Sequence, residues 1–84
     1  MTAAPASARP RLIVTADDFG LHPAVNHAVE RGFREGVLRA ASLMVTAPAV
    51  ADAVARAKRL PGLAVGLHLV LADGQSALPP SQIP

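Results

Sequence analysis

Short apolar runs alternate along the chain with stretches of helical spacing. Three runs have the length and aliphatic character of buried strands: residues 11–16, 41–46 and 63–71. A helical pattern lies between the first two runs, and a second one lies between the last two. The order strand, helix, strand, helix, strand predicts an α/β fold, in which a parallel sheet is joined by right-handed crossovers.

Both predicted helices carry start and stop signals. Pro23 suits the first turn of a helix over 23–35, and Gly36 suits its exit. Pro48 opens the second helix, which ends at Leu60-Pro61-Gly62. The buried sides are expected to be Val25, Ala28, Val29, Gly32 and Phe33 in the first helix and Val50, Ala53, Val54 and Ala57 in the second. The polar side of the first helix is expected to comprise Asn26, Glu30, Arg31 and Arg34.

Three parallel strands leave two edges of the sheet unpaired. A complete (β/α) barrel needs about 250 residues, and this chain has 84. We therefore expect residues 11–84 to be the N-terminal part of a larger domain, preceded by a flexible lead over 1–10. The polar, proline-containing tail over 73–84 is predicted to be loop.

Two adjacent carboxylates, Asp17 and Asp18, follow the first predicted strand. The carboxyl ends of parallel strands are where α/β proteins bind ligands. Adjacent carboxylates repel each other unless a cation or a hydrogen-bond network holds both charges, and a divalent metal would satisfy both. The alternative is that one of the two merely caps the helix that follows. Successive residues of a regular strand point to opposite faces, so the pair shares a site only if the chain bends, and Gly20 makes that easy.

His68 lies in the third predicted strand, whose small-residue face comprises Ala64, Gly66, His68 and Val70. Because the strands are parallel, His68 reaches the same rim as the acid pair, where a neutral imidazole is a common metal ligand. A hydrolytic metal needs about three protein ligands, and no further residue of this chain is well placed to be the third. His22 could overhang the rim, and His27 is expected in solvent. The alternative for His68 is a core histidine bonded to backbone.

The amino-acid composition excludes several kinds of site and argues against some kinds of partner. The chain has no cysteine, so disulfides, thiolate metal sites and cysteine nucleophiles are excluded. Two aromatic residues are too few for stacking on nucleic-acid bases, and a net charge of +2 is only a weak indication of a polyanionic partner, so no nucleic-acid partner is expected. Most basic residues fall on solvent-facing helix positions, with Glu30–Arg34 and Asp52–Arg56 as supporting pairs. The lead lacks an apolar secretion signal and no stretch is long enough to span a membrane, so a cytoplasmic location is the default expectation.

With these residues placed, the chain resembles the start of the YdjC/ChbG-like carbohydrate deacetylase family. The resemblance runs from about Arg11 to the end of the chain. It is carried by residues 16–21 (ADDFGL), Val25-Asn26, residues 41–45 (ASLMV) and residues 61–69 (PGLAVGLHL). Within the family, the tail over 78–82 is similar to that of members associated with hopanoid biosynthesis.

This resemblance implies a (β/α) barrel-like fold and metal-dependent hydrolysis of an N-acetyl group on an amino sugar. It also implies that Asp17 is the general base and that Asp18 and His68 are metal ligands, with Mg²⁺ favoured over Zn²⁺. The family's further metal ligand comes from a later histidine-rich motif outside these 84 residues. The expected partner is an N-acetylated carbohydrate, a homodimer is left open, and the 84 residues alone are not expected to catalyse the reaction.

Two other interpretations of the sequence compete with that of a hydrolase. The first is a non-catalytic βαβαβ module that binds a cation, or a partner by strand addition at an open sheet edge. The second is a receiver-like phospho-acceptor domain, which also begins with an acid pair after its first strand. That domain needs an Asp at the end of the third strand, where this chain has His68.

Overall fold

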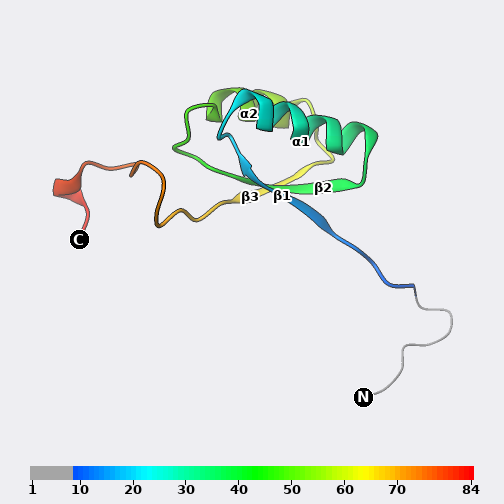
Figure 1. The fold of residues 1–84 in the computed structure, drawn as a ribbon, viewed down its shortest axis with the longest axis horizontal. Coiled ribbons are helices and arrows are strands. Elements are labelled where there is room, and N and C mark those ends of the chain that lie inside the picture. Colours follow the sequence, from blue (N-terminus) through cyan, green and yellow to red (C-terminus); the bar gives the residue numbers. More distant parts are fainter. Residues whose placement is uncertain (1–8) are drawn as a thin grey trace, which may run out of the picture.

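The three predicted strands and two predicted helices are all present, in the predicted order. A computed structural model describes residues 9–84, with the elements β1 (Val14–Phe19), α1 (Pro23–Glu35), β2 (Leu38–Leu43), α2 (Val50–Lys58), β3 (Ala64–Leu67) and a short 3₁₀ turn η1 (Pro80–Gln82). The sheet order is β1-β2-β3, and both strand pairs are parallel. Both helices cover the same face of the sheet, and the tail after β3 extends away from it (Figure 1). The βαβαβ prediction is confirmed.

Local signals in the sequence explain the bounds of α1. The His22 side chain caps its start by accepting a hydrogen bond of 3.0 Å from the Ala24 N–H, and Pro23 occupies the first turn. At the other end, the Gly36 N–H donates to the Gly32 carbonyl. The Pro48 signal for α2 is early by two residues, because residues 47–49 form a turn before the helix begins at Val50. Among residues 9–84, no helix is long and apolar enough to cross a bilayer.

Ion pairs join the two helices on their outer surface. The expected pairs form, with Arg34 Nε 2.9 Å from Glu30 Oε2 and Arg56 Nε 2.9 Å from Asp52 Oδ2. Glu30 Oε1 also accepts from Arg56 and Arg59 of the neighbouring segment, at 3.3 Å each. The prediction of a purely solvent-facing row is therefore wrong for Glu30 and Arg56, whose side chains are only 17% and 18% exposed. They are half-buried where α2 packs against α1.

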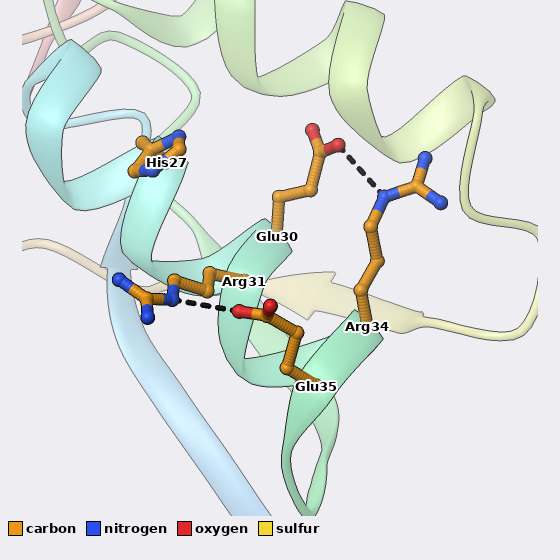
Figure 2. A pocket seen from close by; sticks show the side chains of 5 residues that line it. All are labelled: His27, Glu30, Arg31, Arg34 and Glu35. Carbon is orange, nitrogen blue, oxygen red and sulfur yellow. Dashed lines mark hydrogen bonds and ion pairs between the residues drawn. The ribbon is translucent and has the colours of Figure 1, made fainter.

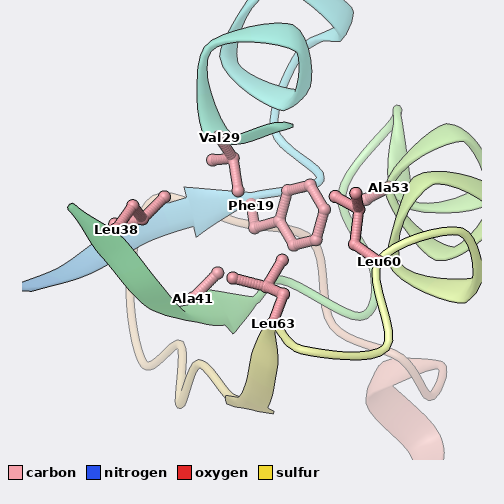
Figure 3. Close-up of a cluster of buried hydrophobic side chains, with 7 residues drawn as sticks. All are labelled: Phe19, Val29, Leu38, Ala41, Ala53, Leu60 and Leu63. Carbon is pink, nitrogen blue, oxygen red and sulfur yellow. The ribbon is translucent and has the colours of Figure 1, made fainter. Parts of the chain in front are cut away.

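The hydrophobic core lies between the helices and one face of the sheet. Its centre is the ring of Phe19, which is fully buried at the end of β1. Figure 3 shows that ring among side chains contributed by both helices, by β2 and by the segment that leads into β3. The buried cluster comprises Phe19, Val29, Leu38, Ala41, Ala53, Leu60 and Leu63.

All three strands differ in extent from the prediction. β1 begins and ends three residues later than expected, because β2 begins at Leu38, which pairs with Val14 and leaves residues 11–13 without a neighbour. β2 instead begins and ends three residues earlier than expected, since Met44, which is buried just after the strand, and Val45 prolong the apolar run. β3 stops at Leu67 because β2 ends at its partner Leu43. Residues 69 and 71, predicted as strand, are 78% and 102% exposed.

The sheet face opposite the helices carries the small and polar residues. Strand pairing aligns Thr15 with Ala40 and Ser42 with Gly66, and paired residues lie on the same face. Ser42 contacts both Asp17 and His68, which places those two side chains on this face as well. The predicted small-residue face of β3 is thus the uncovered one.

Candidate functional site

The two acids are brought together by a β-bulge at the end of β1. Ala16 pairs with Ala41 and Phe19 pairs with Leu43, so β1 advances three residues while β2 advances two. Asp18 takes up the extra residue with a φ of +63°, in the left-handed region that Asp tolerates better than most residues. The bend is therefore at Asp18 itself, whereas Gly20, with a φ of +104°, turns the chain toward α1. After the bulge, Phe19 returns to the core.

His68 approaches the acids from β3, at the opposite edge of the sheet from β1. It follows β3 directly, and its backbone N–H donates a hydrogen bond of 3.0 Å to the Leu43 carbonyl. Its Nδ1 atom lies 3.7 Å from Asp18 Oδ1 and 3.4 Å from the Asp18 backbone nitrogen. The imidazole is 26% exposed and the Asp18 side chain 51%, so the pair is open to solvent on one side. Asp18 and His68 meet at the rim that the sequence indicated.

Ser42 completes the cluster, although it was not among the site residues predicted from the sequence. Its Oγ atom lies 3.0 Å from Asp17 Oδ1 and 3.2 Å from His68 Nδ1, so the middle strand connects the two outer ones. A signal was present in the sequence: Ser42 is the hydroxyl residue in a strand of otherwise mainly aliphatic side chains.

The other candidate residues have different partners. Neither acid caps α1, because His22 occupies that position, so the capping alternative is wrong. His22 is engaged with the Ala24 N–H and does not join the cluster. His27 is exposed on α1, as predicted.

A buried amide supports the turn below the acid pair. Asn26 is fully buried, which corrects the prediction that it lies on the polar side of α1. Its Oδ1 accepts from the Gly20 N–H at 2.7 Å, and its Nδ2 donates to the Ala49 carbonyl and to Asp52 Oδ2, both at 3.0 Å. The hydrogen bond from Asn26, followed by that from Arg56, lowers the pKa of the Asp52 carboxyl. Asn26 thereby ties the turn after β1 to both helices.

The Asp18 Oδ1 and His68 Nδ1 atoms are close enough together to bind the same divalent cation. Two ligands that each lie about 2.1 Å from one ion are at most about 4.2 Å apart, and the 3.7 Å between Asp18 Oδ1 and His68 Nδ1 falls within that limit. These two residues border a hollow of about 370 Å³, whose wall also includes Leu21, Met44 and Asp73. Within residues 9–84, no group of three His, Cys, Asp or Glu side chains is positioned to hold an ion. Asp18 and His68 are thus two residues close enough together to share an ion.

A second hollow, of about 310 Å³, lies on the surface of α1 and has a different character (Figure 2). It is lined by His27 and by two ion pairs of that helix, Arg31–Glu35 and Arg34–Glu30. Because its charged groups neutralise one another within the helix, it presents no converging reactive groups. The acid pair at the sheet rim is the better candidate site.

Comparison with known proteins decides the family. The sequence model described as YdjC-like protein matches residues 11–84, nearly the whole chain. The chain belongs to the YdjC-like family. This YdjC-like chain is 44% identical over 68 residues to a chitooligosaccharide deacetylase of Enterobacter sp. (strain 638). The match covers 81% of this chain and 27% of the deacetylase.

Two more relatives of this YdjC-like chain carry similar names. A carbohydrate deacetylase of Brevibacillus brevis is 48% identical over 64 residues, covering 76% of this chain and 26% of the relative. Carbohydrate deacetylase 2 of Listeria innocua is 45% identical over 65 residues, covering 77% and 26%. This chain thus spans about a quarter of the length of these curated relatives. No solved structure matches it.

Proposed function

We propose that the protein containing this chain is a metal-dependent carbohydrate deacetylase, which hydrolyses the N-acetyl group of an amino sugar. The observation that carries the proposal is the convergence of Asp17, Asp18 and His68 at the carboxyl end of a parallel sheet. The names of the relatives, carbohydrate and chitooligosaccharide deacetylase, support the substrate class. A sugar amide is unreactive, and its hydrolysis calls for an activated water and a polarised carbonyl.

In this proposal, Asp18 and His68 hold the divalent cation. When bound, that cation polarises the substrate carbonyl and lowers the pKa of a coordinated water. Both residues border the same hollow, which opens to solvent, and their Oδ1 and Nδ1 atoms lie 3.7 Å apart. A third protein ligand comes from a part of the protein outside these 84 residues. Carboxylate oxygen suits Mg²⁺ and imidazole nitrogen suits Zn²⁺, and we propose Mg²⁺ first on the strength of the family resemblance.

Asp17 is the proposed general base. It is hydrogen-bonded to Ser42 at one carboxylate oxygen, which leaves the other oxygen to accept a proton. In the reaction, the water oxygen bonds to the acetyl carbon while Asp17 takes the water proton. The carbon–nitrogen bond then breaks, and the leaving nitrogen gains the proton that Asp17 took from water. Acetic acid and a free amino sugar are released, and Asp17 is again a carboxylate.

A second candidate function rests on the open edges of the sheet. β1 and β3 are the outer strands, and Val65 and Leu67 of β3 are 40% and 62% exposed. In the deacetylase these edges pair with further strands of the same protein. In a non-catalytic module they would bind a partner, or a second copy, by strand addition.

Acetate release from an N-acetylglucosamine oligosaccharide separates the two candidates. The full-length protein is assayed before and after chelation, and again after Mg²⁺ or Zn²⁺ is restored. The deacetylase proposal predicts turnover that chelation removes and one of these ions restores. A folded full-length protein that releases no acetate with either ion would favour the binding module.

A further inference from the structure

Ser42 lies between groups that come from opposite edges of the sheet. Its Oγ is 3.0 Å from Asp17 of β1 and 3.2 Å from His68, which follows β3. Its neighbour across the pair of strands is Gly66, where an added Cβ would meet no atom within 4 Å. Among residues 9–84, the Asp17 carboxylate and the His68 imidazole are the side chains within hydrogen-bonding distance of this hydroxyl.

The number of protons on these groups shows for which contact the donor and acceptor are defined. A serine hydroxyl has one proton, and an ionised carboxylate only accepts, so the contact with Asp17 requires Ser42 to donate. His68 Nδ1 faces both the Ser42 oxygen and the Asp18 backbone N–H, at 3.2 and 3.4 Å. One nitrogen cannot donate to the first and accept from the second at the same time. The hydrogen bond from Ser42 to Asp17 is compatible with either state of the ring.

We infer that Ser42 is a positioning residue that orients the Asp17 carboxylate. This inference rests on the proposed function, in which Asp17 is the base. Within the described residues, the Ser42 hydroxyl is the one group that donates a hydrogen bond to this carboxylate. Without that bond, the side chain is free to rotate about its last torsion, and a base that is misplaced by even an ångström loses much of its effect.

The test uses the full-length protein with Ser42→Ala and Ser42→Thr. Thr keeps the hydroxyl, suits a strand, and has room because Gly66 presents no side chain beside it. Ser81→Ala, in the exposed η1 turn, is the matched control. The readouts are kcat and KM for acetate release, metal affinity by calorimetry, and the ¹³C chemical shift of the Asp17 carboxyl group.

Ser42→Ala is expected to lower kcat about tenfold to a hundredfold, with KM and metal affinity unchanged within about twofold. Ser42→Thr should recover most of the loss, and the Asp17 shift should move in Ser42→Ala but not in Ser81→Ala. Equal impairment of the Ala and Thr variants would overturn the inference by indicating a packing role. Loss of metal in Ser42→Ala would overturn it by indicating an action on the metal ligands.

The two proposals fail in different ways. An active wild-type protein whose Ser42→Ala variant retains full kcat contradicts the role of Ser42 alone. A folded wild-type protein without acetate release contradicts the deacetylase, and with it the catalytic part of this inference. The Asp17 shift then still decides whether Ser42 holds that carboxylate.

Discussion

Asn26 Oδ1 accepts a hydrogen bond of 2.7 Å from the backbone N–H of Gly20, and this contact secures the turn that follows the acid pair. The same turn is bonded to the start of α2, since the Ala49 N–H donates to the Gly20 carbonyl at 2.8 Å. Gly20 itself has little freedom to change: its φ is +104°, and an added Cβ would lie 3.1 Å from the Met44 carbonyl oxygen. One fully buried side chain therefore connects the site to both helices.

Replacing Asn26 by Ala should destabilise the fold by about 2–4 kcal/mol, because the Gly20 N–H and the Ala49 carbonyl lose a buried partner. Urea denaturation followed by circular dichroism measures the change. His27→Ala, at the exposed neighbouring position, is the control and should shift stability by less than about 0.5 kcal/mol. Equal stability of the two variants would mean that the Asn26 hydrogen bonds contribute nothing.

Because Asp18 has a left-handed backbone, two substitutions can separate its effect on stability from its proposed role in metal binding. Asn tolerates that conformation, whereas a β-branched residue should cost about 1–2 kcal/mol more. We therefore expect Asp18→Asn to keep wild-type stability and Asp18→Val to lose it, while both lose metal affinity. Chemical denaturation and calorimetry provide the two readouts. An Asp18→Val protein as stable as Asp18→Asn would argue against the bulge.

The sequence predicted the order and type of the elements because helical spacing and strand-like runs depend on local pattern. It did not predict where the strands end, because the residues of a buried turn are as apolar as those of the strand before it. Met44 extended the apparent second strand in this way, and residues 69–71 looked like strand although no neighbour pairs with them. Pairing partners decide where a strand ends, and they are distant in sequence.

The residues of the candidate site could be predicted only in part, because some of its contacts join residues that are distant in sequence. Asp17, Asp18 and His68 follow from the rule that parallel strands end at one rim. The roles of Ser42 and Asn26 depend on contacts made over 25 and 26 residues, with Asp17 and Asp52 respectively. Polarity alone placed Asn26 on the solvent side, although its three hydrogen bonds allow it to be fully buried.

The ion pairs between the helices predict a loss of stability in acid. The hydrogen bond from Arg34 and the nearby Arg59 and Arg56 charges lower the pKa of Glu30, and Asn26 and Arg56 lower that of Asp52. A carboxyl with a lowered folded pKa stabilises the fold above its unfolded pKa and loses this effect as pH falls through the folded one. The thermal midpoint should therefore fall as pH drops below about 4.

Glu30→Gln tests the source of that acid sensitivity. The variant should be less stable than wild type at pH 7, and the difference should shrink as the pH falls below about 4. Glu35→Gln is the matched control, since the Arg31–Glu35 pair is exposed on both sides, and it should follow the wild-type curve. Parallel curves for Glu30→Gln and wild type through the acid range would place the sensitivity elsewhere.

The roles proposed for the acid pair and His68 are tested most directly by metal affinity, measured by titration calorimetry on the full-length protein with Asp17→Asn and His68→Ala. Asp17→Asn should bind metal as wild type does while its kcat falls at least about a hundredfold, because it lacks the base. His68→Ala should lose metal, because an imidazole ligand is gone. An equal loss of metal in both variants would contradict the division of the site into a base and metal ligands.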